Sequence, residues 1–180
     1  MPRPTNLVRD WKPGGAAIAL WAVVGLLVVI AFLLIPTKYG IGGEVSVLPD
    51  PGLTPGVVAS TDQAEVCGIV GGLSYSKRHR VTPVEMKAAV RQRYGMAHCG
   101  EIDHRGPLAL GFADVVENLW CEPGPPEIWN YKIKDKLETF VWEAVCKRHT
   151  MTLAQGQAVF LQPDWRQSYC SLIGGVPCPP

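Results

Sequence analysis

The stretch from Glu101 to Trp120 holds the residue types best suited to chemistry. Asp103 and His104 are adjacent, and Asn118 follows fourteen residues after the histidine. An imidazole can take a proton from water near neutral pH, and a carboxylate oxygen can bind a divalent cation. Residues of these types can take part in such chemistry, whereas a lone Asp-His pair would be typical of a surface turn.

The segments on both sides extend this pattern. Ser76 to Gly95 carries a basic run and then a helical stretch, and a later segment runs from Trp129-Asn130 through Lys134-Asp135-Lys136-Leu137-Glu138. With the Asp-His pair and the asparagine, roughly residues 64 to 170 resemble the small bacterial HNH nucleases. The resemblance implies a small α+β domain with a ββα-metal centre.

The resemblance also implies a role for each motif residue. His104 would be the general base that takes a proton from the attacking water, and Asp103 would bind a divalent metal ion. Asn118 would hold the loop of the base in shape. The implied activity is metal-dependent cleavage of nucleic acid.

One position departs from the family pattern. Where these nucleases carry a second metal-binding histidine, this chain has Lys132, and a protonated ammonium group has no lone pair for a metal. Catalysis would then require that another histidine supply the missing ligand or that Lys132 itself contact phosphate. Other departures are Arg105 and Gly106 after the Asp-His pair, and Cys121 where proline is common; the candidate replacement ligands are His79, His98 and His149.

An apolar segment precedes the domain. Residues 14–35 contain no charged side chain, and at about 1.5 Å per residue they could cross a hydrocarbon core of roughly 30 Å. We therefore expect a transmembrane helix here, although a cleaved signal peptide is the alternative. Because Arg3, Arg9 and Lys12 precede it, the positive-inside rule predicts that residues 1–13 are cytoplasmic. The domain would then be periplasmic, on the bacterial inner membrane.

The cysteines favour the same compartment. Disulfides persist outside the cytoplasm, and no C-x-x-C pattern points to a metal or haem site. Spacing alone leaves fifteen pairings open for six cysteines. The HNH resemblance implies that Cys67 pairs with Cys146. The six candidates for disulfides are Cys67, Cys99, Cys121, Cys146, Cys170 and Cys178.

Local patterns predict the remaining elements. Residues 36–63 form a Gly/Pro-rich linker or surface arm whose apolar residues suggest that it lies along another protein, and residues 171–180 form a tail. Thr82 would cap a helix that ends at Gly95. Ile102 and residues 108–111 would form a hairpin around the Asp-His pair. Helices are expected over residues 129–147, with one apolar face, and over residues 152–161, capped by Thr152.

Two functions compete on these observations. From residue 39 onward, 13 Lys and Arg stand against 15 Asp and Glu, a net charge of −2, whereas nucleic-acid binders are usually basic. With Lys132, this favours a non-catalytic, membrane-anchored accessory subunit without a cofactor, which docks on other subunits of a membrane complex. The alternative is a membrane-tethered endonuclease that uses a divalent metal ion on extracytoplasmic nucleic acid. The fold class expected in both cases is α+β: a single transmembrane helix followed by a small ββα-metal domain braced by disulfides.

Overall fold

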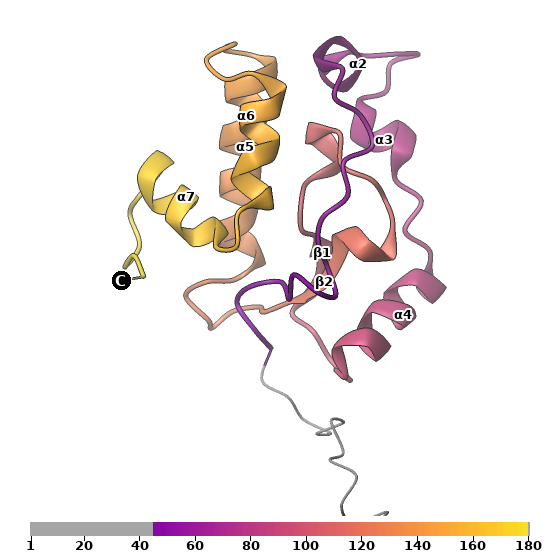
Figure 1. Cartoon of the computed structure of the whole chain (residues 1–180), viewed down its shortest axis with the longest axis vertical. Coiled ribbons are helices and arrows are strands. Elements are labelled where there is room, and N and C mark those ends of the chain that lie inside the picture. Colours follow the sequence, from indigo (N-terminus) through magenta and orange to yellow (C-terminus); the bar gives the residue numbers. More distant parts are fainter. Residues whose placement is uncertain (1–44, 180) are drawn as a thin grey trace, which may run out of the picture. The chain divides into compact units, whose positions relative to one another are not determined.

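The computed structural model describes residues 45–179, so the predicted transmembrane segment 14–35 and the cytoplasmic residues 1–13 lie outside the described part. Within the described residues, no helix has the length and apolar character that crossing a membrane requires. The expected fold class, a transmembrane helix followed by a ββα-metal domain, is therefore corrected for the described residues. The structure is a small α+β fold of six helices and a two-stranded sheet over residues 45–179 (Figure 1).

The elements follow one another with short connections. The helices are α2 (Gln63–Cys67), α3 (Tyr75–His79), α4 (Val84–Tyr94), α5 (Tyr131–Cys146), α6 (Leu153–Leu161) and α7 (Trp165–Leu172). The strands are β1 (Glu101–His104) and β2 (Leu119–Glu122), and two 3-10 turns, η1 (Leu108–Leu110) and η2 (Val116–Asn118), lie between them.

The two strands form an antiparallel pair in which Asp103 lies opposite Trp120 and His104 opposite Leu119. The hairpin expected between Ile102 and residues 108–111 is wrong, because residues 108–110 form η1 instead. Gly111 ends η1 with φ of 79°, a left-handed conformation that glycine adopts without strain. The chain therefore turns at Gly111 as expected, but it returns to the Asp-His pair through β2.

Two helix starts were predicted from capping patterns, with different outcomes. Thr152 caps α6, and its hydroxyl and the Gln155 side chain form the reciprocal capping box. The cap expected at Thr82 is wrong: Pro83 occupies the N-cap of α4, and the Thr82 hydroxyl donates a hydrogen bond to Asp114. Gly95 ends α4 in the left-handed conformation, as the sequence suggests.

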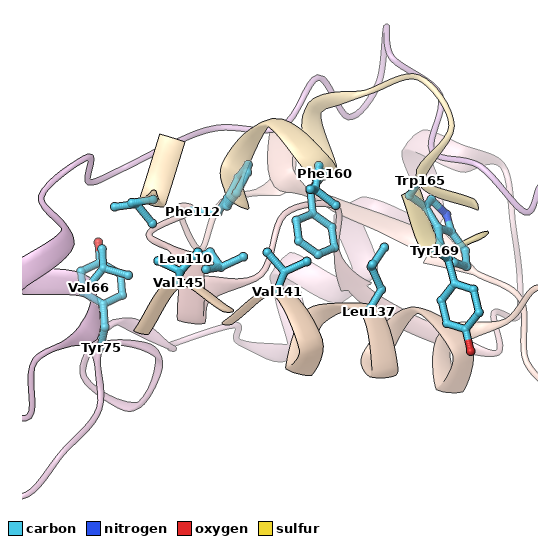
Figure 2. Packing of buried hydrophobic residues seen from close by; sticks show 12 residues of the cluster. Val66, Tyr75, Leu110, Phe112, Leu137, Val141, Val145, Phe160, Trp165 and Tyr169 are labelled. Atoms are coloured by element: carbon cyan, nitrogen blue, oxygen red, sulfur yellow. The ribbon is translucent and has the colours of Figure 1, made fainter. Parts of the chain in front are cut away.

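The core forms on one face of α5. Leu137, Val141 and Val145 recur at four-residue spacing and are fully buried, as the predicted apolar face requires. Their partners come from the other helices and from η1, and Figure 2 shows them side by side: Val66, Tyr75, Leu110, Phe112, Phe160, Trp165 and Tyr169. A Cβ on Gly156 would lie 2.8 Å from Val145, so glycine permits the close contact of α6 with α5. Residues 45–179 thus hold a core of their own, as an independently folding domain does.

Three disulfides tie these elements together. Cys67–Cys146 joins the end of α2 to the end of α5, which confirms the pairing that the resemblance implied. Cys99–Cys121 joins the segment before β1 to β2, and Cys170–Cys178 closes the end of α7 onto the tail. All six cysteines are paired.

The described part of the predicted linker is an ordered arm on the domain itself. Val58 forms a β-bridge with Phe112, and the Gly56 N–H donates to the carbonyl of Glu117. Thr54 is fully buried and donates its hydroxyl to the Leu119 carbonyl. The arm therefore lies on its own domain, where Leu48 and Val58 pack against the core. The expectation that its apolar residues also lie along another protein stays a prediction.

Candidate functional site

Asp103 and His104 end β1, and their side chains have different partners. Successive side chains of a strand point to opposite faces. Asp103 bonds to α5, where its Oδ2 lies 2.7 Å from Nζ of Lys134. His104 bonds to the loop after η1, where its Nε2 lies 2.8 Å from Oδ1 of Asp114. The pair therefore belongs to two hydrogen-bonded groups rather than to one open site.

The first group is centred on a buried lysine. Lys134 is 1% exposed, and its Nζ donates to Asp103 and to Glu138, one helical turn further along α5. A third carboxylate, Oε2 of Glu122, lies 3.9 Å from the same nitrogen. Burial alone would lower the pKa of Lys134, but these three acidic neighbours raise it well above its ordinary value. Lys134 is therefore a buried ammonium ion at neutral pH.

The carboxyl groups around Lys134 differ in pKa: that of Asp103 is lowered, whereas those of Glu138 and Glu122 are raised. Burial would raise the pKa of Asp103, but the charge and the hydrogen bond of Lys134 lower it below its ordinary value. Burial, helped by the nearby Asp103, raises the pKa of Glu138 to about 7. Glu122 is fully buried, and neither carboxylate oxygen has a hydrogen-bond partner. Its burial raises its pKa well above the ordinary value.

These carboxylates include the donor set that a divalent metal would use. One oxygen each from Asp103, Asp135 and Glu138 lies within 4.8 Å of the others, and hard cations prefer such oxygens. However, Lys134 Nζ already donates to two of the three residues. A protonated amine offers no lone pair and repels a cation at this distance. The arrangement does not fit the divalent ion that an HNH centre implies.

The lysine that reaches Asp103 is not the one that the sequence singled out. Lys132 is exposed on the first turn of α5, and its side chain forms no hydrogen bond or ion pair with any described residue. Lys134, two residues further on, takes the place beside the aspartate. The proposed replacement ligands His79, His98 and His149 are not members of the carboxylate group described above.

The second group closes off the histidine. His104 is 2% exposed, and its Nε2 is occupied by Asp114. Asp114 also accepts hydrogen bonds from the backbone N–H groups of Val81 and Thr82 and from the Thr82 hydroxyl. Burial would raise the pKa of Asp114, but these bonds lower it to about 2. A general base must reach the proton that it abstracts, whereas the imidazole here is shielded and bonded within the protein.

Asn118 holds the loop that follows His104. It is fully buried; its Oδ1 accepts from the Gly106 N–H, and its Nδ2 donates to the carbonyls of Gly106 and Ala113. A Cβ on Gly106 would lie 2.2 Å from the Phe112 ring, so glycine is needed where the loop crosses that ring. The position of Asn118 is that of a residue that shapes a loop.

Arg105 has a structural task as well. Its guanidinium is buried and donates to the backbone carbonyls of Thr54, Phe160, Leu161 and Gln162. It thus ties the arm and the end of α6 to the loop after β1. Each of the three departures from the family pattern, Arg105, Gly106 and Cys121, thus has a defined structural role in this fold.

Sequence reasoning missed Lys134 as a cluster member, together with Glu122 and Asp114. Lys134 and Glu138 carried a usable signal, because residues four apart share one side of a helix. Glu122 and Asp114 carried none, since no local pattern marks a carboxyl group that tertiary packing will bury.

Comparison of the chain with protein-family models, with curated proteins and with solved structures finds no match. The HNH resemblance therefore rests on the motif residues and their arrangement alone.

Proposed function

We propose that this chain is a non-catalytic, HNH-like accessory subunit, which docks on a larger membrane protein complex in an extracytoplasmic compartment. The observation that carries the proposal is the ammonium group of Lys134. It lies between Asp103 and Glu138, where a nuclease of this kind would need a divalent cation.

The environment of His104 supports the same conclusion. A phosphodiester would have to approach within hydrogen-bond distance of the imidazole. The ring is buried, and its Nε2 is bonded to Asp114. Neither the base nor the cation of a nuclease is thus available in this geometry.

The disulfides support an extracytoplasmic compartment. Three disulfides in a domain of this size are typical of oxidising surroundings, since cytoplasmic thiols are kept reduced. A net charge of −2 over residues 39–180 further disfavours a dedicated nucleic-acid binder.

A nuclease assay on the full chain tests the catalytic half of the proposal. Single- and double-stranded DNA are incubated with Mg²⁺ or Mn²⁺ and either the wild-type chain or His104→Ala. We expect no cleavage by wild type above the level of the variant. Cleavage by wild type that His104→Ala abolishes would identify an endonuclease and overturn the proposal.

Native electrophoresis tests the docking half. The chain, extracted in mild detergent from the cells that make it, should migrate in an assembly much larger than its own 19.6 kDa. Migration as a free monomer, whatever the result of the nuclease assay, would contradict an accessory role.

A further inference from the structure

The turn between α2 and α3 exposes three apolar side chains without a folding role. Ile69, Val70 and Leu73 are 65%, 58% and 46% exposed. The segment projects beyond both helices in Figure 1, and a Cβ placed on Gly71 or Gly72 would meet nothing within 4 Å. Contiguous exposed apolar side chains on a soluble surface mark an interaction site.

The projecting turn is held firmly. Val70 and Leu73 exchange both backbone hydrogen bonds, at 3.1 and 3.0 Å, around Gly71 and Gly72, which have φ values of 58° and 78°. Below the turn, the Cys67–Cys146 disulfide and the buried Tyr75 fix its two ends. The peptide groups that pair Val70 with Leu73 are therefore satisfied inside the turn and need no partner from the surface that they meet.

Positive charge borders the turn on the α3 side. Lys77, Arg78 and Arg80 follow within seven residues of Leu73, and the chain has no acidic residue between Glu65 and Glu85. None of the three cations forms a salt bridge with a described residue. Arg78 donates to the Glu65 carbonyl and lies over the Tyr75 ring, whereas Lys77 and Arg80 are exposed and present their charge to a partner.

The aromatic side chain of Trp142 also lies near the turn. Ile69, Tyr75 and Trp142 line a hollow of about 230 Å³. Lys147 Nζ lies 5.0 Å from the centre of the Trp142 ring. An apolar projection with an indole and cations around it is the composition of a segment that lies at a membrane–water interface.

We propose that residues 68–80, which we term the apolar tip, dock this domain on an anionic lipid surface. Ile69, Val70 and Leu73 enter the acyl boundary, while Lys77 and Arg80 contact the phosphates. Charge complementarity favours lipid: the cations match anionic headgroups, and the convex turn satisfies its own peptide groups. The inference goes beyond the proposed function and rests on a different part of the surface.

The test uses a fragment of residues 40–180, whose described residues 45–179 hold a core of their own, so that the result reports on this domain alone. The fragment, with all three disulfides formed, is floated with vesicles of phosphatidylcholine alone or with one quarter phosphatidylglycerol. We expect co-flotation only with the anionic vesicles, and loss of that binding in 1 M NaCl.

Two variants separate the apolar and the electrostatic parts. Ile69→Ser/Val70→Ser/Leu73→Ser should weaken vesicle binding at least tenfold. Lys77→Ser/Arg80→Ser should weaken it about tenfold or more, since each cation near an anionic surface contributes roughly fivefold. Circular dichroism and a non-reducing thiol assay check that each variant remains folded.

Matched controls remove the same residue types elsewhere. Val84→Ser/Ile128→Ser/Ile173→Ser removes three exposed apolar side chains, and Lys132→Ser/Lys136→Ser removes two exposed lysines. Both should bind like wild type. The proposal is overturned if wild type does not float with anionic vesicles, or if the controls lose as much binding as the tip variants. It is equally overturned if DNA binds the fragment more tightly than the vesicles and displaces them, which would assign the cations to nucleic acid.

Discussion

The ammonium nitrogen of Lys134 lies 2.7 Å from Oδ2 of Asp103, and the two side chains are 1% and 17% exposed. A covalently attached cation thus neutralises the aspartate that the HNH resemblance assigns to a metal. Glu138, on the next turn of α5, shares the same ammonium group. The helix α5 and the strand β1 are joined here by charge rather than by apolar packing.

Removal of the lysine should destabilise the domain strongly. Lys134→Met leaves Asp103 and Glu138 without their counter-ion, and breaking a buried pair in this way costs about 3–5 kcal/mol. Urea unfolding at pH 7 measures the loss. Lys136→Met, on the exposed face of the same helix, is the control and should change stability by less than about 0.5 kcal/mol.

Loss of the ammonium should also open the carboxylates to a metal ion. In Lys134→Ala, oxygens of Asp103, Asp135 and Glu138 no longer compete with a built-in cation. Millimolar Mn²⁺ should therefore raise the melting temperature of this variant, because a ligand that binds only the folded state stabilises it. Wild type and Lys134→Ala/Asp103→Asn should not respond. An equal increase for wild type would show that the lysine does not exclude the metal.

Ionisation of the buried Glu122 should destabilise the domain as pH rises. Burial holds its pKa above the ordinary 4.5, so its full stability is present below about pH 4.5 and is lost as pH rises toward the folded-state pKa. Glu122→Gln removes this loss. The variant should match wild type at pH 4 and be more stable than wild type at pH 8, because the folded state then no longer holds a buried group that must ionise. A variant that is less stable than wild type at pH 8 would mean that the carboxylate is ionised and paired.

The stabilisation that Asp114 provides should be lost in acid. Its pKa is lowered to about 2, so its stabilisation is present above the unfolded-state value near 3.8 and is lost as pH falls toward 2. Asp114→Asn should be less stable than wild type by about 1–3 kcal/mol at pH 7, because it weakens the bonds to Thr82 and His104. The difference should shrink between pH 4 and pH 2. Urea midpoints across this range measure it, with the exposed Glu85→Gln as control; a constant difference would contradict the assignment.

The local parts of the fold could be predicted from sequence. The apolar face of α5 repeats at three and four residues, and the capping box at Thr152 is a short-range pattern. The pairing of Cys67 with Cys146 followed from the HNH resemblance rather than from spacing. The helix features depend on neighbours along the chain, and the disulfide on a resemblance between motif residues.

The parts that failed depend on tertiary contacts. Thr82 has the sequence of a cap, but Asp114, which is 32 residues away, binds its hydroxyl instead. The strand that pairs with β1 begins only at Leu119, after two 3-10 turns. Alternation of apolar and polar residues predicts strands and does not reveal such turns. Lys132 and Lys134 lie two apart on a helix and so face different sides. Alignment with a motif could not show which of the two lysines lies beside Asp103. The position of α5 against β1 determines that it is Lys134.

The disulfides differ in the length of the loop that each one closes. Cys67–Cys146 spans 79 residues and Cys170–Cys178 only 8. If each acts mainly by restricting the unfolded chain, Cys67→Ser/Cys146→Ser should cost about 4–5 kcal/mol and Cys170→Ser/Cys178→Ser about 2–3 kcal/mol. Urea unfolding of both variants under non-reducing conditions measures the difference, and a thiol assay confirms that the remaining bridges are intact. Equal losses, or a larger loss for the short loop, would show that native contacts of α7 and the tail, rather than loop closure, determine the contribution of these bridges.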